Sequence, residues 1–174
     1  MTDPNKFNPY PNEFTIKCPK CNNPAEFRFP FILYSENSEC EARKSKWECS
    51  EVCRWGNWHV LQIDPNLFKW KDPSGGYSRS NFGIVRCDVC AVRIKHVLEW
   101  PQDAYFVIHH KDDCLWAWTM KHMQVLSSFI MSTERKPEKY AGFYLFLRHI
   151  PKTFLYVKNR EQVVKKINNL IKNT

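Results

Sequence analysis

Two short cysteine pairs constrain the fold of this 174-residue chain more than any other feature. Cys18-Pro-Lys-Cys21 and Cys87-Asp-Val-Cys90 each lie between two runs of residues typical of β-strands. A pair with this spacing predicts a zinc knuckle, a tight turn that directs two thiolates at one metal ion. Structural zinc takes four protein ligands in a tetrahedron, so two knuckles can fill a closed site. The four knuckle cysteines therefore predict a structural metal rather than a catalytic one.

A third pair, Cys49 and Cys53, leaves two ways of combining the ligands. In the first arrangement, the four knuckle cysteines share one zinc ion and residues 22–86 form an insertion. In the second arrangement, the first knuckle joins Cys49 and Cys53, whose separation from it is closer to ordinary zinc-ribbon spacing. We favour the first arrangement, because it uses the two well-formed pairs, but both stay open.

The second arrangement requires a second zinc ion, because Cys87 and Cys90 then need two further ligands. His109 or His110, together with Cys114, would complete such a site. The sequence therefore predicts one or two structural zinc ions, with the four knuckle cysteines as ligands in either case. Cys40 has no evident partner.

Most of the net charge of +8 belongs to the last part of the chain. Residues 136–174 contain nine Lys or Arg and two Glu, whereas the rest is nearly balanced. A basic segment attracts phosphate backbones or acidic protein surfaces. The residues that we expect to contact such a partner in this segment are Lys152, Lys158, Arg160, Lys165 and Lys166.

A second candidate for partner binding is a basic and aromatic loop region. Lys69, Trp70, Lys71 and Arg79 surround a Gly-Gly turn there. Aromatic rings stack on unpaired bases while lysine and arginine contact phosphates, so this composition is compatible with nucleic-acid binding. The match to any phosphate-binding motif is poor, because a Gly-Gly pair alone indicates only a turn.

A cluster of histidines and aspartates is the one candidate for catalysis. His109, His110, Asp112 and Asp113 lie within five residues, and metal-dependent nucleases and hydrolases use these residue types. Their spacing matches no known motif. A helix cap with solvated histidines explains the presence of these residues equally well. The sequence therefore favours a non-enzymatic protein over an enzyme.

The pattern of apolar residues predicts an α+β fold. Residues 1–13 are polar and contain three prolines, which indicates a flexible lead-in. Residues 14–110 predict an antiparallel, zinc-ribbon-like β region, and residues 111–174 predict two or three helices packed on the sheet, with a basic C-terminal helix. We expect the first helix to begin at Asp112 or Asp113 and to end near Met131.

The knuckles make the stretch from Phe14 to about Lys95 resemble the zinc-ribbon class. The stretches Leu115-Trp-Ala-Trp-Thr and Ile150–Arg160 resemble parts of small uncharacterised bacterial cysteine-pair proteins. In common ribbons a glycine often follows the second cysteine, whereas Asn22 and Ala91 stand there in this chain. The resemblance implies a structural metal and, often, nucleic-acid or protein binding.

Together these features predict a zinc-stabilised, non-enzymatic module that binds nucleic acid or an acidic protein. Two alternatives are a metal-dependent nuclease or hydrolase at the histidine–aspartate cluster and a structural subunit of a larger assembly. The start of the chain lacks the pattern of a secretory signal and no run is long enough to cross a bilayer. We therefore expect a cytoplasmic protein without membrane contact, in which paired cysteines bind metal before they form disulfides. The oligomeric state is not predicted.

Overall fold

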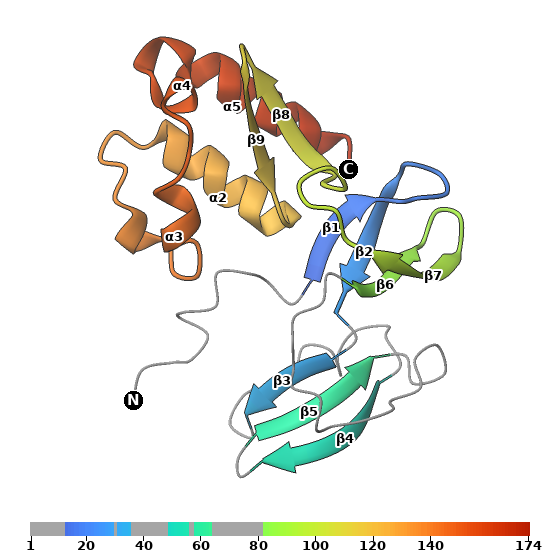
Figure 1. Ribbon diagram of the computed structural model, residues 1–174. Coiled ribbons are helices and arrows are strands. Elements are labelled where there is room, and N and C mark those ends of the chain that lie inside the picture. The colour runs from blue at the N-terminus through green and yellow to red at the C-terminus, as the bar shows by residue number, and fades with distance from the viewer. Residues whose placement is uncertain (1–12, 30, 36–48, 56–57, 64–81) are drawn as a thin grey trace. The chain divides into compact units, whose positions relative to one another are not determined.

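The computed structural model describes residues 13–29, 31–35, 49–55, 58–63 and 82–174 of the chain. The chain divides into two compact units, one made of the residues up to Lys17 with Trp100–Thr174 and the other of Cys18–Glu99. We call them the helical unit and the knuckle unit. As expected, the fold is α+β, with antiparallel strands followed by helices (Figure 1).

A four-stranded sheet holds the two cysteine pairs at its turns. Its strands are β1 (Glu13–Lys17), β2 (Pro24–Arg28), β6 (Phe82–Cys87) and β7 (Val92–Val97), in the order β1-β2-β6-β7. Alternate residues of β1 and β2 are buried, as expected for strands with one face toward the core. The first knuckle follows β1 and the second connects β6 to β7.

Strands β2 and β6 approach each other closely at Gly83. A Cβ atom at this position would collide with the ring of Phe27 and with the carbonyl oxygen of Arg28. The backbone register pairs Phe27 with Val85 and Arg28 with Ile84, so the collision would fall between neighbouring strands. Glycine at this position therefore permits the β2–β6 pairing on which the position of the second knuckle depends.

A second, three-stranded sheet lies within the segment that separates β2 from β6. Its strands are β3 (Phe31–Ser35), β4 (Cys49–Trp55) and β5 (Trp58–Ile63), in the order β3-β5-β4. Both neighbouring pairs are antiparallel, and a register shift interrupts the β4–β5 pairing between Glu51 and Cys53. The described part of the segment between the knuckles thus contains a sheet of its own.

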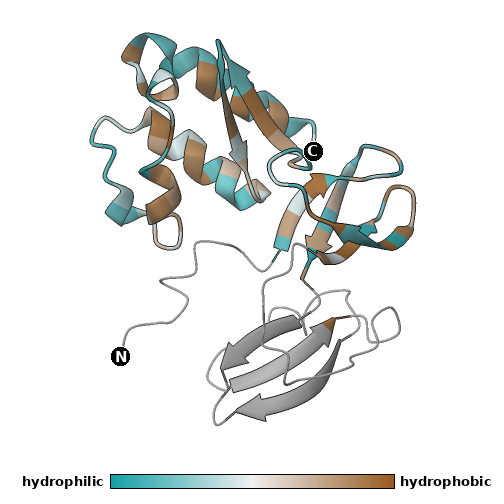
Figure 2. Ribbon diagram, viewed as in Figure 1, coloured by the Kyte–Doolittle hydropathy of each residue, from teal (hydrophilic) through white to brown (hydrophobic). Residues whose placement is uncertain are grey.

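Apart from β1, the described residues of the helical unit form a β-hairpin and five helices, one of which is a 3-10 helix. Its elements are β8 (Phe106–His110), β9 (Asp113–Ala117), α2 (Met120–Met131), the 3-10 helix η2 (Pro137–Lys139), α3 (Tyr144–Leu147), α4 (Lys152–Leu155) and α5 (Val157–Lys172). Helices α2 and α5 run alongside the hairpin, and apolar and polar residues alternate along α5 (Figure 2). None of the helices in the described residues is long and apolar enough to span a membrane.

The core of the helical unit lies between the hairpin, α2 and α5. Its buried residues come from all of these elements and from the segment around α3 and α4: Phe106, Ile108, Leu115, Met123, Leu126, Phe129, Ile130, Leu147, Ile150, Phe154, Val163 and Ile167. Side chains that alternate along β8 and β9 meet the apolar stripes of the two long helices. This unit therefore has a hydrophobic core of its own.

The expectation of a helix that begins at Asp112 or Asp113 is wrong. Residues Asp113–Ala117 form strand β9, and α2 begins only at Met120. The side chain of Thr119 caps α2 by accepting a hydrogen bond from the backbone N–H of His122 at 3.2 Å. The apolar run Leu115–Trp118 is too short for its periodicity to distinguish a strand from a helix, and its first three residues belong to β9. The predicted end of the helix near Met131 is confirmed.

The start of the last helix lacks a side-chain cap. Asn159 and Gln162 have the residue types and spacing of a capping box, but α5 begins at Val157 and its N-cap, Tyr156, makes no side-chain capping bond. Asn159 is instead buried, and its amide donates to the carbonyl oxygen of Thr153 at 2.7 Å. Asn159 therefore fastens α5 to α4 rather than capping α5.

Candidate metal centre

The pairing of β2 with β6 brings the two knuckles together. The strands are antiparallel, with Glu26 opposite Arg86. The first knuckle precedes β2 and the second follows β6, so both lie at the same end of this strand pair. Cysteines that are 66 to 72 residues apart in the sequence thereby become neighbours. Sheet register, rather than local sequence, thus assembles the four-cysteine cluster.

The four sulfur atoms have the spacing of a tetrahedral thiolate site. The Sγ atoms of Cys18 and Cys90 are 3.6 Å apart, as are those of Cys21 and Cys87, and all four lie within 4.8 Å of one another. Zinc–sulfur bonds of about 2.3 Å give tetrahedral sulfur–sulfur edges of about 3.8 Å. Cys18 and Cys87 are buried, and Cys21 and Cys90 are half-buried. The cluster therefore fits a closed metal site with four protein ligands.

Each knuckle turns through a residue in the left-handed backbone region. Asn22 has φ of 59° and Ala91 has φ of 53°, and each directly follows the second cysteine of its pair. In the first knuckle the turn is closed by hydrogen bonds from Asn22 N–H to Cys18 O and from Cys18 N–H to Asn23 O, at 2.9 and 2.8 Å. The positions where ribbons often carry glycine therefore keep the conformation that glycine favours.

Ala91 adopts this conformation at a cost in free energy, because its Cβ crowds the backbone. We expect Ala91→Gly to raise the free energy of unfolding of the zinc-bound protein by about 1 kcal/mol. Asn22→Gly is the matched control and should gain less, since asparagine tolerates the left-handed region. Urea denaturation in the presence of zinc measures both, and an Ala91→Gly protein no more stable than the wild type would contradict this assignment.

Backbone and amide groups donate hydrogen bonds to the sulfur atoms. The N–H of Lys20 donates to Cys18 Sγ and the Asn23 side-chain amide donates to Cys21 Sγ, both at 3.4 Å. The bonds from Asn23 lower the pKa of the Cys21 thiol, whereas desolvation raises the pKa of Cys90. Donors aimed at sulfur stabilise the thiolate form that binds metal. Asn23 thus supports the thiolate of Cys21. The sequence analysis did not identify this role, although the position of Asn23 two residues after Cys21 could have indicated it.

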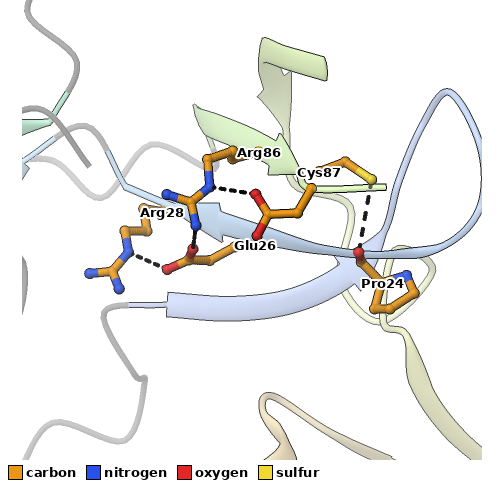
Figure 3. A network of polar contacts seen from close by, with 6 residues as sticks. Pro24, Glu26, Arg28, Arg86 and Cys87 are labelled. Carbon is orange, nitrogen blue, oxygen red and sulfur yellow. Dashed lines mark hydrogen bonds and ion pairs between the residues drawn. The ribbon is translucent and has the colours of Figure 1, made fainter. Parts of the chain in front are cut away.

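A network of charged groups supports the sheet beside the cluster (Figure 3). Glu26 on β2 bridges Arg28 and Arg86, with N–O distances of 2.7 and 3.2 Å. Arg86 also contacts Asp88 in the second knuckle at 3.3 Å, and Cys87 Sγ lies 3.9 Å from the carbonyl oxygen of Pro24. The Glu26–Arg86 and Pro24–Cys87 contacts cross from β2 to β6, so they hold the two knuckle-bearing strands in register.

The structure gathers the ligand set of the first arrangement. Among the described residues, the four knuckle cysteines are the group of three or more potential ligands close enough to hold a metal ion. The side chains of Cys49 and Cys53 lie outside the described part of the chain, and so does Cys40. Cys114, which the second arrangement would use, is exposed on β9 in the helical unit. Metal binding by Cys49 and Cys53 stays a prediction.

The histidine–aspartate cluster is the turn of the β8–β9 hairpin. His109 is exposed, whereas His110 is buried with its ring 6.0 Å from that of Phe154, as side chains alternate along the strand. Asp113 accepts a hydrogen bond of 2.6 Å from the Thr153 hydroxyl, which gives it a structural role. Within the described residues these groups do not gather as a metal site. The geometry gives the nuclease or hydrolase alternative no support.

The predicted partner-binding residues fall into two groups. Lys69, Trp70, Lys71 and Arg79 lie outside the described residues. Lys152 on α4 and the α5 residues Lys158, Lys165 and Lys166 are exposed, whereas Arg160 is half-buried. The Lys166 amino group donates to the carbonyl oxygen of His109 at 2.7 Å, so it fastens α5 to β8.

No family model, curated protein sequence or solved structure matches the chain.

Proposed function

We propose that the protein is a zinc-stabilised, non-enzymatic module that binds nucleic acid through α5. In this proposal the four knuckle cysteines hold one structural zinc ion, which fixes the knuckle unit. A four-thiolate site leaves no open coordination position for a substrate or water, so the metal supplies stability rather than chemistry. The binding function is assigned to the helical unit instead.

A row of lysines on the solvent side of α5 carries the nucleic-acid proposal. Lys158, Lys165 and Lys172 are exposed and follow one another at intervals of seven residues, which is nearly two helical turns. Neighbouring members are therefore about 10 Å apart on one face. The buried side chains of α5, such as Val163 and Ile167, lie on the opposite face. We call these three residues the lysine row.

The members of the lysine row form no ion pair with the protein. Glu161 is exposed on α5 between Lys158 and Lys165, but within the described residues no ion pair joins any of the three lysines to it or to another acidic group. Three lysines against one glutamate leave this face positive, and closely spaced cations bind polyanions with release of counterions. Nucleic acid fits this surface better than a small anion does, because its phosphates repeat along a line as the lysines do.

The salt dependence of binding tests the proposal. We expect Lys158→Gln with Lys165→Gln to flatten the log–log dependence of oligonucleotide affinity on salt by about 0.7 per lysine for single strands and about 0.9 for duplex. Fluorescence anisotropy with labelled oligonucleotides measures this. The control, Lys121→Gln with Lys139→Gln, changes the net charge equally at exposed positions outside α5 and should leave the slope unchanged.

Two outcomes would contradict this function. A flat salt response of the wild-type protein would show that phosphate contacts do not drive binding. Equal affinity for poly-glutamate and for an oligonucleotide of matched charge would instead identify an acidic protein as the class of partner.

A further inference from the structure

Two arginines meet at the carboxyl end of α2. Arg160, in the first turns of α5, directs its Nη1 to the carbonyl oxygen of Met131, the last residue of α2, at 3.5 Å. Arg135 lies four residues after the end of α2, and its backbone N–H donates to the Ser132 hydroxyl at 3.3 Å. Ser132 is the C-cap of α2. Both arginines are therefore anchored within one residue of the same helix end.

Several guanidinium nitrogens of this pair are buried without an acceptor. Nε and Nη2 of Arg135 and Nε of Arg160 have almost no exposed surface, and among the described residues none of them has a hydrogen-bond partner. Buried donors of a charged group are nearly always satisfied in native proteins, because leaving them unpaired is costly. The arrangement thus has donors for which the described protein provides no acceptor.

The pair also lacks a counter-charge. Glu134 is next to Arg135 in the sequence, but its carboxylate contacts Lys139 and Lys136 at 2.6 and 3.4 Å. Within the described residues no ion pair joins either arginine to an acidic group. Desolvation, and then the nearby charge of Arg160, lower the pKa of the Arg135 guanidinium. Two cations are thus held close together, and a bound anion would offset both their desolvation and their mutual repulsion.

The carboxyl end of α2 explains only part of this arrangement. A helix carries about half a negative charge at this end, which favours a nearby cation. That effect accounts for the Arg160 contact with Met131, but it supplies no acceptor to the three buried nitrogens. Guanidinium groups bind phosphate through paired N–H donors, and a phosphate has enough oxygen atoms to serve two arginines at once.

We propose that Arg135 and Arg160 together bind a phosphate group at the carboxyl end of α2. The inference goes beyond the nucleic-acid proposal, since Arg160 faces away from the lysine row on α5. The phosphate belongs either to a small phosphorylated molecule or to the end of a nucleic-acid strand. Both sources offer the same dianionic, tetrahedral group.

Titration with inorganic phosphate at constant ionic strength, with chloride as the exchanged anion, tests the site directly. We expect phosphate to shift the NMR signals of the Arg135 and Arg160 Nε–H groups and to raise the melting temperature. Arg135→Gln or Arg160→Gln should weaken phosphate binding about tenfold or more, as the loss of a charge-assisted hydrogen-bond donor implies. The Lys158→Gln/Lys165→Gln protein is the control and should bind phosphate as the wild type does.

Arg135→Gln keeps the proposal testable even if Arg160→Gln weakens the capping of α2. It leaves the backbone bond to Ser132 in place, and it removes one of two unneutralised charges. Without phosphate this protein should therefore melt no lower than the wild type, whereas with phosphate the wild type should melt higher. A wild type that responds identically to phosphate and chloride, or an Arg135→Gln protein that binds phosphate unchanged, would overturn the proposal.

Oligonucleotides with and without a 5′-phosphate distinguish the two sources. Tighter binding of the phosphorylated strand, abolished by Arg135→Gln, assigns the site to the end of a nucleic acid. Binding of inorganic phosphate without any effect of the 5′-phosphate assigns it to a small phosphorylated ligand. The two proposals fail separately, because loss of the salt-dependent oligonucleotide binding leaves the phosphate titration intact, and the reverse also holds.

Discussion

Cys87→Ser is expected to abolish zinc binding and to unfold the knuckle unit. Cys87 is buried, its Sγ lies 3.6 Å from that of Cys21, and it ends the strand that pairs with β2. Serine replaces a soft thiolate by a weak ligand, so the tetrahedron loses one corner. Zinc-binding free energies of structural sites are of the order of 10 kcal/mol, and in small metal-bound units they are largely folding free energy.

Zinc content and backbone amide spectra of the purified variant measure this effect. We expect the metal to be lost and the amide signals of β2, β6 and β7 to collapse toward unfolded positions. Cys114→Ser is the matched control, since Cys114 is exposed on β9 and should leave both readouts unchanged. A Cys87→Ser protein that retains full zinc would remove Cys87 from the ligand set.

The second large effect is expected in acid and arises at His122. This residue is fully buried, and its ring packs against those of Trp118, Phe143 and Phe146 at centroid distances of 4.8, 4.9 and 4.1 Å. Its Nδ1 accepts a hydrogen bond of 3.1 Å from the backbone N–H of Trp118, which requires the neutral ring. Burial lowers the pKa of His122 from 6.5 to about 3.

This lowered pKa makes the protein less stable as the pH falls. Below 6.5 the unfolded chain binds a proton at His122 that the folded protein does not accept until about pH 3. The contribution is therefore fully present above pH 6.5 and decreases by about 1.4 kcal/mol per pH unit between these two values. At pH 4.5 the expected loss is about 3 kcal/mol.

A comparison with His122→Phe isolates this effect. Phenylalanine keeps an apolar ring in place, and the lost acceptor for the Trp118 N–H costs the same at every pH. Because acid also protonates thiols and releases zinc, the difference between the two stability curves is the readout. The curves should converge toward acid pH, and His149→Gln, which removes an exposed histidine, should run parallel to the wild type. Parallel curves for His122→Phe would contradict a buried neutral His122.

The knuckles could be predicted from sequence because they are local. A pair of cysteines three residues apart between strands specifies a turn, whichever other ligands complete the site. The combination of the pairs could not be decided, since it depends on β2 pairing with β6 across an insertion that contains a sheet of its own. Gly83 is part of that pairing, but a single glycine between apolar residues does not indicate which strand will pair with it.

In the helical unit, the start and end of each element were harder to predict from sequence than the α+β fold class. The apolar stripe of α5 is periodic, so a basic C-terminal helix was expected. Asp113 was an adequate helix cap by residue type, yet it begins β9 because Leu115 and Ala117 both face the core as alternate strand positions do. The Arg135–Arg160 pair gave no local signal, because one member follows α2 and the other lies on α5.

Zinc stoichiometry of the Cys49→Ser/Cys53→Ser protein tests the central claim most directly. If the four knuckle cysteines form one closed site, the wild type and this variant should each bind one zinc ion per chain, measured by native mass spectrometry, because the ligands are the same. The alternative arrangement places Cys49 and Cys53 at the first knuckle's metal and a second zinc ion at Cys87 and Cys90, so it predicts two ions in the wild type and one in the variant. A variant that binds fewer zinc ions than the wild type would contradict the four-cysteine site.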